Sequence, residues 1–223
     1  MELDFIIWLS NERCGEIKKL KTLKGRSKMK KTLIVMAVIA ASALVAAETA
    51  TSTIVATDFS TSEKVDELFK LGGPVDVKDG KLNMPSAGIA TMKKELPQEF
   101  TVKVKITFNA LVADKQGFAG FLIDDMPLML NSKGTTHVQY SPKGDTRTHG
   151  KYIAVEGFEL NKPVTLTVIR QKVEGGYEHT FTIDKQEIGK FYAPGSEKAP
   201  AVVLYDTNEN VSFDDFEFTP VCK

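Results

Sequence analysis

Polar and apolar side chains alternate strictly over residues 100–109, and this pattern constrains the fold more than any other feature of the chain. Apolar residues occupy the even positions from Phe100 to Phe108, and Thr or Lys occupies the odd positions between them. A period of two places successive side chains on opposite faces of a β-strand. The segment is therefore predicted to be a strand with one buried face and one face in water.

The same alternation recurs along most of the chain after residue 52. It is clear at 164–168 and 181–183, and Glu174-Gly175-Gly176 between them predicts a hairpin turn. Shorter strands are predicted at 53–57, 75–77, 82, 88–92, 117–123, 128–131, 137–140, 152–155, 188–192 and 201–205. Only residues 62–70 have a helical pattern, with Ser62 as the cap. About a dozen short strands separated by turn residues predict an all-β sandwich or barrel.

The last strand contains an irregularity. Its apolar residues change from odd positions, 211 and 213, to even positions, 216 and 218, with Asp214-Asp215 at the change. A period of two cannot place both pairs on one face unless an extra residue is inserted. We therefore predict a β-bulge at Asp214-Asp215.

Three segments resemble the concanavalin A-like or laminin G-like jelly-roll domains of exported bacterial proteins. They are residues 99–104, the hairpin from 164–168 into 179–184, and the closing strand 211–218. The hairpin in that superfamily typically ends in Asp-Gly-Lys, whereas here Lys185 follows Asp184 without the glycine. The resemblance implies a two-sheet antiparallel jelly-roll sandwich over residues 59–220, an architecture used for sugar recognition.

The segment 29–47 has the order of parts that defines a bacterial signal peptide. Lys30-Lys31 form a positive start, residues 33–41 form an apolar run, and Val45-Ala46-Ala47 form a small-residue cleavage site. The apolar run is shorter than the roughly 20 residues that span a bilayer. We expect cleavage after Ala47, a periplasmic or secreted protein, and no stable membrane insertion after cleavage. An uncleaved N-terminal anchor is the alternative.

The domain organisation follows from this segment. Residues 1–28 are charged and unpatterned, and we interpret them as a mis-annotated N-terminal extension that is not translated. Residues 48–57 are predicted to be a tether and the first strand, and residues 58–223 the sandwich domain. Nine of the 29 Lys and Arg and four of the 29 Asp and Glu precede residue 48, which leaves 20 basic and 25 acidic residues. Such an acidic domain is a poor partner for nucleic acid or anionic lipid.

The sequence lacks the patterns of the common catalytic centres. The laminarinase-like hydrolases of the resembled superfamily carry a Glu-x-Asp-x-Glu strand, which is absent, and Glu156 and Glu159 fall on opposite strand faces. The three histidines show no short metal-ligand spacing, and His179 is expected to be half-buried on its strand. Cys222 has no partner after cleavage, so it is either an idle thiol or an intermolecular link.

Calcium is the metal that the sequence could hold. Asp58 follows the first strand, Asp214 lies in the last, and terminal strands of such sandwiches commonly lie side by side. Calcium binds several carboxylate and carbonyl oxygens. These two residues are therefore a candidate structural calcium site. The alternative is that the acids form a solvated edge that discourages edge-to-edge pairing.

The richest stretch for ligand binding is 132–152. It gathers polar and aromatic side chains among three glycines, and loops on a rigid sandwich commonly carry binding residues. The candidate ligand-binding residues are His137, Tyr140, Arg147, His149 and Tyr152. A plain solvated connection is the alternative, and the only tryptophan, Trp8, precedes the predicted mature chain.

These observations predict an exported, non-catalytic module that binds extracellular or cell-surface carbohydrate such as a polysaccharide. Two alternatives stay open. One is a sugar-active enzyme of the same fold, a glycoside hydrolase or polysaccharide lyase. The other is a structural or protein-binding domain of the cell envelope.

We expect the exported protein to begin at Glu48, because the predicted peptidase site follows Ala47. Mass spectrometry of the N-terminal peptide, on protein recovered from the periplasm or the medium, measures this directly. A mature peptide containing Trp8 would contradict the predicted start at Met29. A chain that begins at Met29 and stays with the membrane would favour the uncleaved anchor.

Overall fold

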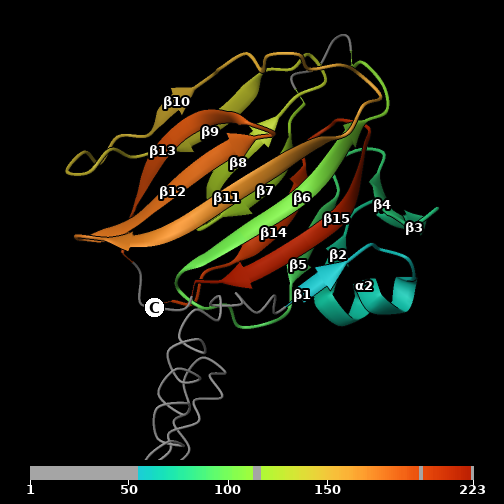
Figure 1. Ribbon diagram of the computed structural model, residues 1–223, viewed down its shortest axis with the longest axis horizontal. Helices are drawn as coiled ribbons and strands as arrows, with labels where there is room; N and C mark the ends of the chain where they lie inside the picture. Colours follow the sequence, from blue (N-terminus) through green and yellow to red (C-terminus); the bar gives the residue numbers. More distant parts are fainter. Residues whose placement is uncertain (1–54, 113–116, 196–197, 222–223) are drawn as a thin grey trace, which may run out of the picture. The chain divides into compact units, whose positions relative to one another are not determined.

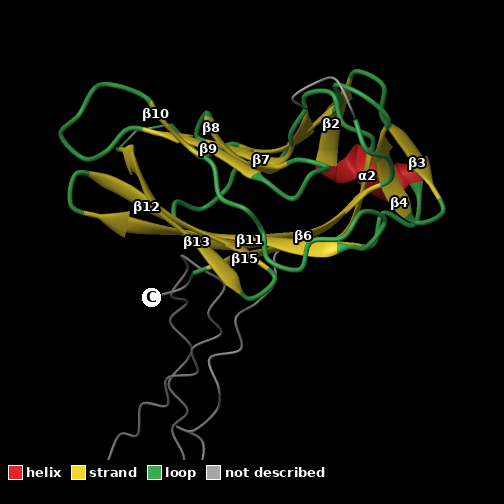
Figure 2. Cartoon of the chain, turned by 90° about the horizontal axis from the view of Figure 1, so that it is seen from above, coloured by secondary structure: helices red, strands yellow, loops and turns green. Residues whose placement is uncertain are grey.

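Two antiparallel sheets lie face to face in the part of the chain that the computed structural model describes, residues 55–112, 117–195 and 198–221 (Figures 1 and 2). This arrangement confirms the predicted all-β sandwich. The expectations for residues 1–28 and 29–47, for the cleavage site and for Cys222 lie outside the described residues and stay predictions.

All neighbouring strands in both sheets run antiparallel. The eight-stranded sheet contains, in spatial order, β13 (Gln186–Pro194), β12 (Gly176–Ile183), β11 (Val164–Val173), β6 (Phe100–Phe108), β15 (Val211–Pro220), β4 (Lys81–Met84) and β3 (Asp76–Lys78), with β1 (Val55–Thr57) also paired to β15. The seven-stranded sheet contains β10 (His149–Lys151), β9 (Thr136–Tyr140), β8 (Met126–Leu130), β7 (Ala119–Ile123), β14 (Val202–Asp206), β5 (Ile89–Met92) and β2 (Phe69–Gly72).

One short helix, α2 (Ser62–Leu68), packs at one end of the sandwich (Figure 2). Its N-cap is Thr61 rather than the predicted Ser62, and the Thr61 side chain accepts a hydrogen bond from the backbone N–H of Lys64. The helix ends earlier than the predicted residue 70, because Phe69 turns into β2 and pairs with β5. No helix in the described residues is long and apolar enough to cross a membrane.

The predicted β-bulge in the last strand is confirmed. Between Asp214 and Glu217 the strand advances three residues while β6 advances two, and Asp215 has a φ of 46°. The extra residue restores the register. The apolar residues on both sides of it, Val211, Phe213, Phe216 and Phe218, therefore all lie in the core.

Two tight turns have positive φ at both of their central residues. Asp79 and Gly80 join β3 to β4 with φ values of 54° and 72°, and Asp124 and Asp125 join β7 to β8 with 51° and 62°. Positive φ at both central residues matches the right-handed twist of a hairpin and favours Gly, Asn and Asp. After β12, Asp184 has a φ of 50° where the resembled superfamily has its Asp-Gly step.

The prediction of a strand at 152–155 is wrong, because the strand that pairs with β9 is β10, which ends at Lys151. The ladder is interrupted after Lys151. The hydroxyl of Thr136 accepts the backbone N–H of Ile153, while the carbonyl of Ile153 accepts the backbone N–H of Thr136, and Ala154 forms an isolated bridge to Thr135. A side chain thus replaces one of the two main-chain partners that a regular ladder would supply at Ile153.

Three polar side chains meet between the two sheets, within the otherwise apolar core. Arg170 in β11 and His179 in β12 are 1% and 0% exposed, and both face Asp124 from the β7–β8 turn. Arg170 Nε donates to Asp124 Oδ2 at 2.7 Å, and His179 Nε2 lies 3.4 Å from the same oxygen. The guanidinium also lies 3.5 Å from the ring centroid of Tyr177 and donates to the backbone carbonyl of Gln98. His179 is therefore fully buried, not half-buried as expected.

The environment of Asp124 favours its ionised form. Burial alone would raise the pKa of this carboxyl, but hydrogen bonding with His179 and the charge and hydrogen bond of Arg170 together hold the pKa below its usual range. A buried arginine is costly without a counter-ion. This ion pair therefore ties the turn of one sheet to the strands of the other.

We expect Asp124→Asn to lower the free energy of unfolding by about 3 kcal/mol, because it leaves Arg170 buried without a charge partner. Asp125→Asn is the matched control: it changes the neighbouring, exposed turn residue and should cost less than about 0.5 kcal/mol. Since the pKa of Asp124 is lowered in the folded state, the difference in free energy of unfolding between the wild type and Asp124→Asn is complete above about pH 4 and shrinks at more acidic pH. Urea titrations of both variants measure this, and equal losses would contradict it.

Candidate functional site

The outer face of the seven-stranded sheet carries apolar, aromatic and uncharged polar residues on its five central strands. The sheet curves so that this face is concave (Figure 2). Alternate residues of its strands point into the core, which leaves the others outside. The outward residues on β5, β14, β7, β8 and β9 are Ile89, Thr91, Val203, Tyr205, Leu122, Pro127, Met129, His137 and Gln139.

Three rings gather at one end of this face, and we call Phe118, His137 and Tyr152 the aromatic cluster. Phe118 immediately precedes β7, His137 lies in β9, and Tyr152 follows β10 at the level of His137. The rings of His137 and Tyr152 are stacked, with an interplanar angle of 3° and centroids 5.1 Å apart. The ring of Phe118 lies 4.6 Å from His137 and 6.3 Å from Tyr152. Tyr152 is 60% exposed, so the cluster presents an aromatic ring to solvent.

A row of residues leads from the cluster across the sheet. His137 pairs with Met129, which pairs with Gly120, which pairs in turn with Tyr205. Met129 is only 2% exposed although it faces outward. Gly120 has a φ of 150°, and a Cβ there would lie 2.7 Å from the carbonyl oxygen of Leu128. Only glycine fits this position, so the middle of the row has no side chain.

The environment of His137 within the aromatic cluster favours the neutral form of its imidazole. Burial lowers the pKa of its imidazole below the ordinary value of 6.5, and its Nε2 atom is buried without a hydrogen-bond partner. A neutral ring stacks on Tyr152 with no charge to be solvated. The face is therefore suited to a ligand with an apolar surface and neutral polar groups at its edge.

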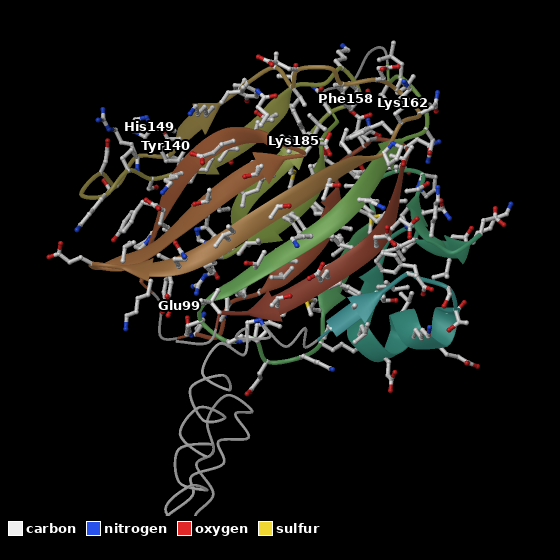
Figure 3. The ribbon with its side chains drawn as sticks, viewed as in Figure 1. Glu99, Tyr140, His149, Phe158, Lys162 and Lys185 are labelled. Carbon is white, nitrogen blue, oxygen red and sulfur yellow. The ribbon has the colours of Figure 1, made fainter. Side chains whose placement is uncertain are left out.

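The structure separates the five predicted ligand-binding residues into two groups. His137 and Tyr152 belong to the aromatic cluster, whereas Tyr140 and His149 lie side by side near β10, at the end of the sandwich (Figure 3). Tyr140 is on the inward side of β9, and its ring packs 5.1 Å from Phe191 in the other sheet. Residues 137 and 140 are an odd number apart, so one strand presents them on opposite faces.

Arg147 joins the second group through Asp145. The guanidinium donates to both carboxylate oxygens, and His149 Nε2 lies 3.1 Å from Oδ2. Hydrogen bonds from Arg147, followed by the one with His149, hold the pKa of Asp145 far below its usual range. Arg147 and His149 thus already have a carboxylate partner within their own loop, so they are less free to bind a ligand.

The two predicted calcium ligands each have partners within their own segment. β1 and β15 pair as expected, but Asp58 accepts from the backbone N–H of Ser60 and lies 3.8 Å from Lys64 Nζ. Asp214 accepts from the backbone N–H of Asp215, and it is Asp215, not Asp214, that lines an open pocket with Asp58. Within residues 55–112, 117–195 and 198–221, no three His, Cys, Asp or Glu side chains are grouped to hold a metal ion.

Phe118 was not among the predicted residues. The alternation over 117–123 places it on the same face as Leu122 of β7, and a phenylalanine on the outward face of a strand is the signal that could have identified it. Its contact with His137 joins segments 19 residues apart in the sequence, which local patterns do not indicate.

No protein-family model matches the chain, and no curated protein sequence matches it. Several solved structures are similar. An endo-1,3-β-glucanase from Streptomyces sioyaensis matches with a TM-score of 0.60 and 11% identity, over 77% of this chain and 97% of that one. The carbohydrate recognition domain of Emp46p, in a metal-free form, matches with a TM-score of 0.51 and 9% identity, over 70% of this chain and 89% of that one. The alginate lyase vAL-1 from Chlorella virus matches with a TM-score of 0.52 and 12% identity, over 76% of this chain and 100% of that one.

These similarities confirm the expected fold, a concanavalin A-like jelly-roll sandwich. The fold is shared by carbohydrate-recognition domains and by enzymes that cleave polysaccharides. At 9–12% identity these structures show the architecture alone.

We expect NMR titration to give His137 a pKa below 6.5, because burial disfavours its charged form. In Tyr152→Ala the value should rise toward 6.5, since the ring stacked on the imidazole is removed and water returns. His137→Gln assigns the signal among the three histidines. An unchanged pKa in the Tyr152 variant would show that Tyr152 does not contribute to the burial of His137.

Proposed function

We propose that the chain is a non-catalytic carbohydrate-binding module that holds a neutral polysaccharide on the outer face of its seven-stranded sheet. The exposed ring of Tyr152, stacked on His137, is the observation that carries this proposal. Tyrosine has an apolar ring and a polar hydroxyl, which match the C–H face and the hydroxyl edge of a pyranose. Export to the periplasm or the medium, as the predicted signal peptide implies, belongs to the same proposal.

The curved sheet supports an extended ligand. The row from His137 through Met129 and Gly120 to Tyr205 crosses four strands, so successive sugar units could lie along it. Similar solved structures include a glucanase, a lectin-type recognition domain and a lyase that all act on or recognise glycans. These likenesses support a sugar as the class of ligand.

The identity of the outward residues favours binding over cleavage. Glycoside hydrolysis generally needs two carboxylates that flank the scissile bond. On the described strands β5, β14, β7, β8 and β9, every outward position is apolar, aromatic or a neutral amide or hydroxyl residue. A sugar-active enzyme is the alternative function, because the same fold also carries hydrolases and a lyase.

The charge of the domain favours a neutral polymer. The chain from residue 48 onward has 25 acidic and 20 basic residues, and its net negative charge repels a polyanion at low salt. We therefore expect β-1,3-glucan or mixed-linkage β-1,3-1,4-glucan to bind more tightly than alginate.

Tyr152→Ala should weaken polysaccharide binding about ten-fold, the loss expected when one aromatic anchor is removed. Tyr192→Ala, the same change on β13 of the other sheet, is the control and should leave the Kd unchanged within about two-fold. Affinity electrophoresis against laminarin, lichenan and alginate measures all three proteins. Equal losses in the two variants would place the ligand elsewhere.

The same samples test the enzyme alternative. Incubation of the wild-type protein with each polymer, followed by measurement of new reducing ends and of unsaturated sugar products, detects hydrolase and lyase activity. Release of either product would contradict the non-catalytic proposal and establish the sugar-active enzyme instead. Absence of binding to every glycan on an array would contradict a carbohydrate ligand and favour the structural or protein-binding alternative.

A further inference from the structure

Two buried carboxylates at the end of β14 have oxygen atoms without partners. Asp206 is the last residue of β14 and is 0% exposed, and Glu209, three residues later, is 2% exposed. Asp206 Oδ2 and Glu209 Oε2 are both buried and have no hydrogen-bond partner among the described residues. Native interiors rarely leave such atoms unsatisfied, and a bound ion or water is a common reason when they do.

The second oxygen of each carboxylate is fixed by the backbone. Asp206 Oδ1 accepts from the N–H groups of Asn208 and Glu209 at 3.1 and 2.7 Å. Glu209 Oε1 accepts from the N–H of Ser132, which precedes β9, at 3.2 Å. These bonds hold both side chains in place while leaving the outer oxygens free. The pair is therefore preorganised.

The loop backbone closes tightly around this pair. A Cβ on Gly117 would lie 2.9 Å from Glu209 Cγ and 2.8 Å from the carbonyl oxygen of Asn208. Only a residue without a side chain allows this approach. Gly117 thus packs directly against Asn208 and Glu209.

Neither carboxylate forms a salt bridge in the described part of the chain. Buried carboxylates are ordinarily paired with a cationic group or coordinate a metal ion.

We infer that Asp206 and Glu209 bind a calcium ion through these two free oxygens. Both side-chain donors are carboxylate oxygens, which hard cations such as calcium prefer. Calcium accepts six to eight oxygen ligands in flexible geometry, so backbone carbonyls and water can complete its shell. The site is distinct from the Asp58 and Asp214 pair, and it does not depend on carbohydrate binding.

The position of the site connects it to the aromatic cluster. Thr207 lies between Asp206 and Glu209 in the sequence. Its Oγ1 accepts the backbone N–H of Phe118 at 2.8 Å, and its own backbone N–H donates to the carbonyl of Phe118 at 2.9 Å. An ion bound to Asp206 would therefore order the loop that fixes one ring of the cluster.

The test compares the wild-type protein with Asp206→Asn, Glu209→Gln and the exposed control Asp66→Asn on α2. Thermal unfolding at pH 7.5 is measured in EGTA and in about 10 mM calcium chloride, with magnesium chloride and sodium chloride as ionic-strength controls. Saturating calcium should raise the Tm of the wild type and of Asp66→Asn by about 5–10 °C. Asp206→Asn and Glu209→Gln should lose this rise, and calorimetry should show one calcium ion per wild-type chain.

The two site variants remain informative without calcium. Each removes a buried charge, so each should have a Tm in EGTA at or above that of the wild type, which separates loss of binding from loss of folding. Absence of calcium binding to the wild type would overturn the inference. Binding that survives in both site variants but disappears in Asp58→Asn would overturn it in favour of the terminal strands.

Discussion

Burial of one face of every strand between the two sheets is the constraint on which the rest of the structure depends. It fixes most of the inner residues as apolar. The outer face of the seven-stranded sheet is released from this constraint, yet it keeps apolar and aromatic side chains such as Tyr152 and Ile89, which are 60% and 38% exposed. An outward aromatic residue adds nothing to the core, so its presence requires a different explanation.

Local patterns predicted most of the fold. The period of two located nearly all of the strands, and the phase change at 214–215 located the bulge. The errors lie where tertiary pairing overrides local preference. Phe69 and Lys70 fit a helix pattern equally well, and their pairing with β5 makes them a strand. After Lys151, the Thr136 hydroxyl replaces one main-chain partner in a ladder that the sequence predicted would continue.

The candidate site was less predictable, because its contacts join distant segments. The sequence identified His137 and Tyr152 but grouped them with Tyr140, although strand parity separates residues 137 and 140. The pairing of Asp124 with Arg170, 46 residues apart, and the meeting of Glu209 with Ser132, 77 apart, depend on how the sheets stack. Local periodicity contains no information about such contacts.

The bulge at Asp214-Asp215 has a consequence for how the last strand can change in evolution or in the laboratory. Because β15 has one residue more than β6 between Asp214 and Glu217, deleting one aspartate would leave the apolar residues on both sides in strict alternation, and all of them would still face the core. A deletion elsewhere in the strand would instead turn the apolar residues on one side of it toward solvent. The bulge is therefore the point at which this strand can lose a residue without exposing its core side chains.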